Sequence, residues 1–454
     1  MEKSSNGNVG FVTLVSIVAA VGGLLFGYDT SVISGAIGFI QTKFGFGNAM
    51  QGWVVSCLMI GAIIGAAFAG FLSDRLGRKK MLIAAGLLFT IGSISSAVAS
   101  NITIFVTARI IGGIGIGVSS TLVPLYIAEI APSKHRGRLV SLNQLAVVIG
   151  ISAIYFVNRA IVNAGSQTWD INYSWRWMFG CGLIPGILFV ILLFLVPESP
   201  RWLHKKGLEK KSFTILEKIN GTQQAKKELE DMKKSIQKET SGSLSLLFKS
   251  GYRTALLIGV VLAILQQVTG INAIMYYAPE IFKKVGVGTN ASFTETIIVG
   301  LVNFVFTIVS LWLIDKAGRK TLLVIGAAVM TVSLAVVGFE FNAAHPNGTL
   351  ILIFILLFVA AFAVSFGPIV WLVIAEIFPT SIRGRATAIA SVALWLADYV
   401  VSQFFPVLLG KTGASMTFYI FAILGVVAFI FSLTVVRETK GKTLEEIETD
   451  WLKS

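Results

Sequence analysis

Residues 70–80 read GFLSDRLGRKK, and 241 residues after Asp74 the chain repeats the pattern as LWLIDKAGRK at residues 311–320. Each stretch stands between two long apolar runs, and about 20 apolar residues carry an α-helix across the hydrocarbon core of a bilayer. The basic residues of each stretch therefore mark a short loop that connects two membrane-spanning helices.

Two more features recur at nearly the same distance along the chain. Glu129 stands seven residues before an Arg-Gly-Arg triplet that begins at Arg136, and Glu376 stands seven residues before the triplet at Arg383. The first half closes with PESPR around Glu198, and the second closes with the related sequence RETKG. Such a repeat is typical of transporters in which two related bundles move about a central site.

The composition favours lipid rather than water around most of the chain. Of the 454 residues, 55% are hydrophobic and 13% are charged, and the formal net charge is +14. The basic residues stand in loops between apolar runs, which argues against a nucleic-acid-binding surface and for a membrane protein. We expect an all-α membrane protein with twelve transmembrane helices. The expected spans are residues 11–36, 51–72, 81–99, 103–128, 139–161, 177–196, 255–282, 293–314, 321–341, 350–377, 386–409 and 416–436.

These spans divide the chain into four parts. We expect an N-terminal six-helix half at 1–197, a linker of amphipathic helices at 198–254, a C-terminal six-helix half at 255–436 and a tail at 437–454. Lys and Arg gather in alternate loops, and cytoplasmic loops carry an excess of these residues. The protein should therefore be a multi-pass protein of the plasma (inner) membrane, with the linker and both termini in the cytoplasm.

Charged residues at the cytoplasmic ends of the spans can form a conformational latch. Asp74 with Arg78, and Glu129 with Arg136, can bridge neighbouring helices, and the second half offers a matching set. We expect these bridges to close the inner face and to break when it opens. Any one pair could be solvated loop charge, but the recurrence favours a latch. The predicted latch residues are Asp74, Arg78, Glu129, Arg136, Glu198, Asp315, Arg319, Glu376 and Arg383.

Asp29 and Arg109 stand inside apolar spans, where an unpaired charge costs at least about 2.5 kcal/mol at the bilayer centre. At 1.5 Å per residue, the two lie ~27 Å and ~28 Å above the cytoplasmic ends of their spans. The equal depths predict an ion pair. The pair is either purely structural or a switch, in which protonation of Asp29 couples proton entry to opening. A switch needs burial to offset the effect of Arg109 on the carboxyl group.

Amide side chains converge near the middle of the bilayer. They belong to Gln144, Gln266, Gln267 and Asn303. Uncharged polar groups suit a neutral ligand rich in hydroxyls, although buried amides also join membrane helices to one another. Successive helical residues point about 100° apart, so Gln266, Gln267 and Asn272 cannot share one face of a regular helix. If all three bind the ligand, their span must unwind near Gly270.

Two other features have more than one reading. Trp371, which follows Gly367 and Pro368, is either a stacking platform for a sugar ring or a tryptophan of the membrane interface. The glycine-rich run at 112–117 lies inside an apolar span with no strand before it. It therefore predicts close helix packing rather than a phosphate-binding loop.

Over essentially its whole length, the chain resembles the sugar porter family of the major facilitator superfamily. The resemblance implies the major facilitator fold, two six-helix repeats about a central sugar site, and it is strongest to bacterial proton-coupled symporters. The matching stretches are GGLLFGYDTSVISG from Gly22, DRLGRKK from Asp74, ARIIGGIGIG from Ala108, PESPRW from Pro197, QQVTGINAIMYYAPEIF from Gln266 and GPIVWLVIAEIFPTSIRGRA from Gly367.

The resemblance also implies roles for individual residues. Proton-driven members of the family resemble this chain at Asp29, whereas animal facilitative glucose carriers have an amide there, so Asp29 and Arg109 would couple protons. Leu394 stands where a related symporter has a glutamine contact, and Asp398 adds an acid beyond Trp395, so the identity of the sugar stays open. The candidate substrate-binding residues are Phe26, Gln144, Gln266, Gln267, Asn272, Tyr277, Asn303, Trp371 and Trp395.

We therefore expect a monomeric transporter that takes up a neutral monosaccharide or polyol with protons by alternating access. A facilitative sugar uniporter is the alternative, and a membrane sugar sensor that does not transport is a more remote one. The histidines and cysteines are far apart in sequence, and no nucleophile stands near a base. No enzymatic activity, cofactor or metal is expected.

Overall fold

The computed structural model describes residues 8–132, 135–239, 252–378 and 383–440. For residues 234–239, 315, 375, 383 and 384 it describes the backbone alone. Within these ranges, twelve helical segments are long and apolar enough to cross a membrane, which confirms the predicted number of spans.

The first six spans are helices α1 to α8, of which the last three join to form one span. The sixth span contains a turn of π-helix, η1, which follows α6. The bounds are α1 Val9–Phe44, α2 Asn48–Leu76, α3 Arg78–Ala97, α4 Ile102–Ile130, α5 Arg136–Ala164, α6 Gln167–Trp169, η1 Asp170–Ser174, α7 Trp175–Gly180 and α8 Leu183–Leu195.

The last six spans are helices α12 to α19, and two of these spans are interrupted. The seventh consists of α12 and α13, and the tenth of α16 and α17. The bounds are α12 Tyr252–Val268, α13 Ile271–Lys283, α14 Thr289–Ala317, α15 Arg319–Asn342, α16 Gly348–Val364, α17 Phe366–Ile377, α18 Arg383–Lys411 and α19 Gly413–Thr434.

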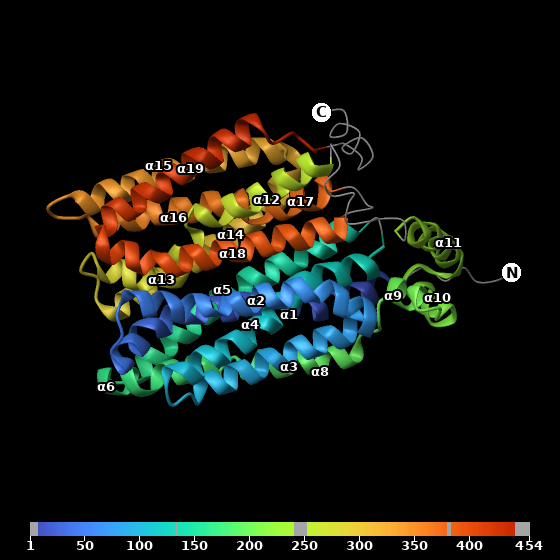
Figure 1. Cartoon of the computed structure of the whole chain (residues 1–454), viewed down its shortest axis with the longest axis horizontal. Helices are drawn as coiled ribbons and strands as arrows, with labels where there is room; N and C mark the ends of the chain where they lie inside the picture. Colours follow the sequence, from blue (N-terminus) through green and yellow to red (C-terminus); the bar gives the residue numbers. More distant parts are fainter. Residues whose placement is uncertain (1–7, 133–134, 240–251, 379–382, 441–454) are drawn as a thin grey trace.

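The spans form two bundles that lie side by side, one from each half of the chain (Figure 1). The halves meet where α2 packs on α18, α5 on α14 and α1 on α13. Three short helices, α9 (Pro200–Lys205), α10 (Glu209–Asn220) and α11 (Thr222–Glu239), lie beyond one end of the bundles (Figure 1). We call this the α9 end, and the opposite one the α6 end. The domain boundaries drawn from the sequence stay a prediction.

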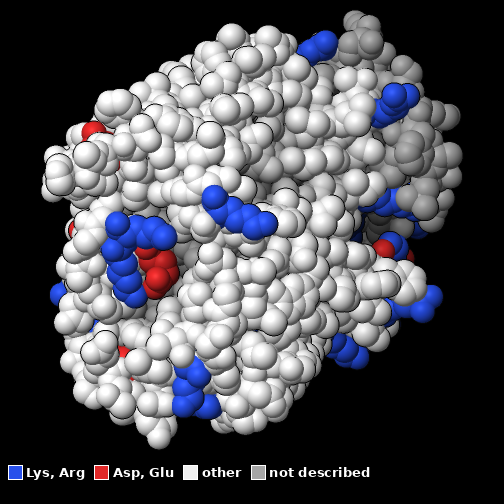
Figure 2. Space-filling model, turned by 60° about the vertical axis from the view of Figure 1, so that its left-hand side comes forward, with Lys and Arg blue, Asp and Glu red and all other residues white. Residues whose placement is uncertain are grey.

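The outside of the bundle is suited to lipid. Phe68, Phe71, Ile184 and Leu195 are all more than half exposed, although water would disfavour such exposure. The broad surface between the two ends carries few charged side chains, and Lys and Arg gather toward the ends (Figure 2). This distribution is the one that a bilayer requires.

Glycines bring α2 and α4 close together. A Cβ atom at Gly113 would overlap the carbonyl of Leu58, and one at Gly117 would overlap the carbonyl of Ala62. The run at 112–117 therefore serves helix packing, as its sequence context predicts.

Candidate functional site

Asp29 on α1 and Arg109 on α4 form the buried ion pair that their equal depth predicts. The Nη1 atom of Arg109 donates to Oδ1 of Asp29 at 2.5 Å, and the side chains are 2% and 6% exposed. The Nη2 atom also donates to the backbone carbonyl of Asp29 at 3.2 Å. Residue 29 thus supplies both acceptors that hold the guanidinium.

The surroundings of Arg109 make this pairing important. The guanidinium lies over the ring of Phe179, with its carbon 5.1 Å from the ring centroid, and its buried Nε atom has no hydrogen-bond partner. Removing the negative charge of Asp29 would therefore leave a buried cation with neutral acceptors, which is costly in a dry interior. Loss of that charge would therefore weaken the contact between α1 and α4.

The seventh span is broken where the amide pattern predicts. Helix α12 ends at Val268 and α13 begins at Ile271, and Gly270 between them has φ +93°, a region that favours glycine. The break brings together two amides that one helical face could not present, since Nδ2 of Asn272 donates to Oε1 of Gln267 at 2.7 Å. The predicted unwinding near Gly270 is confirmed.

A second break, which the sequence reasoning missed, lies in the tenth span. Helix α16 ends at Val364 and α17 begins at Phe366. The Nε2 atom of Gln266 donates to the carbonyls of Phe366 and Gly367 at 2.7 and 3.1 Å. Gln266 thus joins the two broken spans in this conformation. The available signal was Pro368, because proline has no backbone N–H and is favoured in the first turn of a helix, where Pro368 lies in α17.

The aromatic residues predicted for the site come from both halves, and one pair of rings joins the halves. The rings of Phe26 on α1 and Trp395 on α18 have centroids 5.4 Å apart. Trp395 is buried, and its Nε1 donor has no partner. The hydroxyl of Tyr277 already donates a hydrogen bond to the carbonyl of Ser402 at 2.9 Å. Trp371 is half-buried on α17. Of these rings, Trp395 has the free buried donor that a ligand could meet.

Gln144 and Asn303 belong to α5 and α14, which pack against each other across the boundary between the halves. Asn303 is buried and Gln144 is half-buried. They therefore come from the same interface that Phe26 and Trp395 span, although from another pair of helices.

Further contacts close the halves against each other toward the α6 end. Gln403 on α18 donates to the carbonyl of Ala49 at 3.0 Å and accepts from Ser56 on α2 at 3.0 Å. The rings of Phe39 and Phe293 stack with centroids 6.4 Å apart. These contacts come from helix segments near that end.

The charged cluster of the first half lies at the α9 end, but its pairing differs from the prediction. Arg78 donates to both carboxylate oxygens of Glu129 at 3.0 Å and to Asp74 at 2.8 Å. Both oxygens of Glu129 are held by Arg78, and Arg136 is exposed, so in this conformation Arg78 takes the place predicted for Arg136. Glu198 accepts from the backbone N–H of Arg78 at 2.9 Å.

The second half repeats this cluster. Arg319 donates to Glu376 at 3.1 Å, and Thr439 donates to the other oxygen of Glu376 at 2.5 Å. Glu438 accepts from the backbone N–H of Arg319 at 2.9 Å, as Glu198 does in the first half. The side chains of Asp315 and Arg383 lie outside the described atoms. Glu438 was missed as a latch residue, although the RETKG repeat placed it opposite Glu198.

Each bridge described above joins helices of a single half. Arg78 ties α2, α3 and α4, whereas Arg319 ties α15 to α17. The described bridges therefore brace each half, and the role of the charged residues as a latch stays a prediction.

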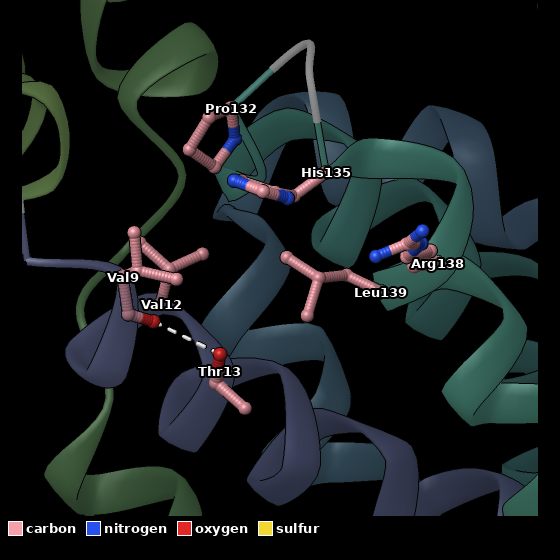
Figure 3. Close-up of a pocket in the computed structure, with 7 residues that line it drawn as sticks. All are labelled: Val9, Val12, Thr13, Pro132, His135, Arg138 and Leu139. Carbon is pink, nitrogen blue, oxygen red and sulfur yellow. Dashed lines mark hydrogen bonds between the residues drawn. The ribbon is translucent and has the colours of Figure 1, made fainter.

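A pocket of about 180 Å³ opens at the α9 end, between the first turns of α1 and α5 (Figure 3). It contains none of the predicted site residues. Its lining residues are Val9, Val12, Thr13, Pro132, His135, Arg138 and Leu139.

Two repeated membrane bundles, with a buried ion pair in one and broken, amide-bearing helices in the other, define a secondary transporter. The chain belongs to the sugar transporter family, whose model, described as "Sugar (and other) transporter", matches residues 15–451. The family is one of transporters rather than enzymes.

Relatives and solved structures agree with this assignment. The chain is 48% identical to the arabinose-proton symporter of Bacillus subtilis (strain 168), over 98% of this chain and 96% of that protein. It is 41% identical to the D-xylose-proton symporter of Escherichia coli (strain K12), with the same coverage of both. It also matches a partially occluded, inward-open structure of the E. coli xylose transporter XylE, with TM-score 0.87, 39% identity and coverage of 96% and 100%. The fold is therefore that of the major facilitator superfamily.

Proposed function

We propose that this chain is a secondary active transporter that takes up a neutral monosaccharide or polyol together with a proton. The observation that carries the proposal is the buried pair of Asp29 and Arg109. A carboxylate that holds a buried guanidinium can take up a proton only by loosening that contact, so proton binding and helix movement are linked.

The sugar class is supported by the chemistry of the second half. Gln267 and Asn272 are held beside the helix break at Gly270, and their amides can donate to and accept from hydroxyl groups. The relatives reported above are named for arabinose and D-xylose, and others are named for galactose and glucose. We propose a monosaccharide of this kind, with a polyol as the other candidate.

The setting of the transporter belongs to the same proposal. The positively charged loops favour a cytoplasmic position for the α9 end and for both termini. The relatives place the chain in the class of bacterial multi-pass plasma-membrane transporters. One chain supplies both halves of the site, so we propose that the monomer is the functional unit.

Transport by the purified protein in proteoliposomes tests the proposal. A panel of labelled arabinose, D-xylose, galactose, glucose and inositol should reveal one or more solutes that accumulate when an inward proton gradient is imposed. Addition of that solute without a gradient should make the outside medium more alkaline. Empty liposomes and a sugar acid, whose charge the neutral amides do not match, serve as controls.

The same assay separates the alternatives. A facilitative uniporter would equilibrate the sugar with no effect of the gradient and no change in external pH. A sensor would bind the sugar in detergent but show neither net flux nor exchange in liposomes. Either result would overturn proton symport.

A further inference from the structure

Asp398 is another buried carboxyl group, and it lies in the half that lacks the Asp29–Arg109 pair. It is 1% exposed on α18, less than one turn after Trp395. Its Oδ1 atom accepts from the hydroxyl of Ser402 at 3.1 Å, and its Oδ2 atom accepts from the hydroxyl of Tyr276 on α13 at 3.2 Å. Both hydrogen bonds come from neutral groups.

No cation of the described part of α18 can reach this carboxyl group. The nearest basic residues on the helix, Arg385 and Lys411, are each 13 residues away, which is ~20 Å along a helix. Elsewhere in the described part of the C-terminal half, Lys and Arg also stand at or beyond helix ends. Arg109 is occupied by Asp29.

The other titratable groups that face Asp398 are neutral as well. They are Tyr276 and Tyr277 on α13. Cys57 of α2 interacts with Tyr277, and Tyr155 and Arg109 interact with Tyr276. Helices α12 and α17 also pack near α18, but they carry Arg253 and Glu376 at the α9 end. Because the charge of Arg109 is already matched by Asp29, an ionised Asp398 would have no cation of its own, whereas the protonated form carries no charge.

The hydroxyl partners suit a group that changes protonation state. A hydroxyl can donate a hydrogen bond to a carboxylate, and it can accept one from a carboxylic acid after rotation. Ser402 and Tyr276 can therefore serve both forms of Asp398 without a change in packing.

Polar contacts connect Asp398 to the candidate sugar-binding amides. The side chain of Asn272 interacts with Asp398, and in this conformation its Nδ2 atom donates to Gln267 at 2.7 Å. Gln267 contacts the side chain of Gln266 at 3.4 Å, and Gln266 binds the α16–α17 break. A change at Asp398 therefore acts on Asn272 first.

We propose that Asp398 is a second proton-binding carboxyl of this transporter, and that its protonation sets the sugar affinity of the C-terminal half through Asn272. The inference rests on the proposed function. Ionised Asp398 draws the Nδ2 donor of Asn272 to itself. When Asp398 takes up a proton from water, its carboxyl becomes neutral and the Asn272 donor is released for a sugar hydroxyl. Sugar affinity should then fall as the pH rises.

Binding measurements in the Asp29→Asn background isolate this effect, because that change removes the titration of Asp29. The dissociation constants of labelled arabinose, D-xylose, galactose, glucose and inositol would be measured in detergent between pH 5 and pH 9. We expect the single variant to lose affinity by about tenfold as the pH rises, for the solute that binds. The double variant Asp29→Asn/Asp398→Asn should bind that solute equally well at every pH.

Two further variants keep the test decisive. Ser402→Ala removes a donor to the ionised form, so it should move the loss of affinity to higher pH, even if the Asp398 variant fails to fold. Asp170→Asn is the matched control, since Asp170 is a buried aspartate at the α6 end, bonded to Ser174. It should leave the pH profile unchanged.

The outcomes separate the two proposals. A pH-independent Asp29→Asn variant, or a double variant that keeps the pH dependence, overturns the role of Asp398 while sugar exchange in liposomes still supports transport. If no sugar or polyol of the panel binds or exchanges in the unmodified protein, the proposed function fails, and the role of Asp398 fails with it.

Discussion

The two halves share a sequence repeat, but they bury charge in different ways. In the first half, Asp29 and Arg109 form an ion pair deep in the bundle. In the second half, the buried Asp398 accepts instead from the hydroxyls of Tyr276 and Ser402. Under the two proposals above, the first half couples protons to helix movement through a charge pair, whereas in the second half a proton on Asp398 adjusts how the solute is recognised.

The clusters at the α9 end show a smaller difference of the same kind. The side chains of Arg78 and Glu129 are 8% and 5% exposed, whereas those of Arg319 and Glu376 are 11% and 19% exposed. The ion pair of the first half is therefore the less solvent-exposed of the two. Breaking a dry pair leaves a buried charge without its partner, so the first half should be more sensitive to such changes.

The largest expected effect is that of Asp29→Asn. The asparagine oxygen can still accept from Arg109, so the fold should survive, but the side chain can no longer bind and release a proton. We expect accumulation of the sugar to be abolished and sugar exchange across the liposome membrane to continue.

Both activities can be measured in one preparation, with and without an imposed proton gradient. Asp170→Asn, another buried aspartate, should retain accumulation and is the control. Gradient-driven accumulation by the Asp29→Asn protein would contradict the assignment of proton coupling to the first half.

The second largest effect is the difference in lost stability between the variants Arg78→Ala and Arg319→Ala. Loss of Arg78 leaves the buried Glu129 without a cation, which costs about 3 kcal/mol. Arg319→Ala should cost less, because Glu376 is more exposed and also bonded to Thr439.

Thermal unfolding in detergent should therefore show a larger fall in Tm for the Arg78 variant. Arg75→Ala is the control, since Arg75 is exposed and packs on Phe71. Equal falls in Tm for the Arg78 and Arg319 variants would contradict the expected difference between the two clusters.

Much of the fold could be predicted from the sequence, because lipid imposes a simple rule on it. The length of the apolar runs predicts the twelve spans. The cost of burying an unpaired charge predicts that Asp29 pairs with Arg109. The break at Gly270 followed from helical geometry, since two amides could not otherwise meet.

Other details could not be predicted, because they depend on which neighbour lies nearest. Sequence spacing offered Arg136 as the partner of Glu129, yet Arg78 lies closer across the helix interface. The use of Gln266 to hold the α16–α17 break requires the packing of two spans that are distant in sequence. Glu438 was recognisable only through its repeat partner, Glu198.

A smaller effect is expected for Gly270→Ala. Alanine at φ +93° is strained, and its Cβ would lie 2.9 Å from the ring of Phe421. We expect a loss of about 1–2 kcal/mol in stability, together with weaker sugar binding, because the break positions Asn272.

Gly47→Ala is a suitable control, since Gly47 has φ −85° and open space at the Cβ position. Tm and sugar affinity would be measured for both variants. An unchanged affinity in Gly270→Ala would separate the break from solute recognition.

The smallest expected effect is a difference in pH-dependent stability between Glu198 and Glu438, which cap equivalent helices in the two halves. Burial raises the pKa of Glu198, although backbone N–H groups of Ser199, Lys79 and Arg78 oppose the shift. Burial acts in the same direction on Glu438, but hydrogen bonds from the backbone N–H groups of Lys440, Arg319, Lys320 and Thr439 outweigh it and lower the pKa. The fold therefore favours the ionised form of Glu438 and the protonated form of Glu198.

These opposite directions give opposite pH dependences. The stability from Glu438 is present above the pKa of an unfolded glutamate and is lost as the pH falls through its lowered value. Glu438→Gln should cost about 1 kcal/mol near pH 7, and the cost should shrink toward pH 4. The stability from Glu198 is lost as the pH rises through its raised value, so Glu198→Gln should be neutral or slightly stabilising near pH 7. Tm measured from pH 4 to pH 8 would test this, and parallel curves for the two variants would show that the caps do not differ in charge.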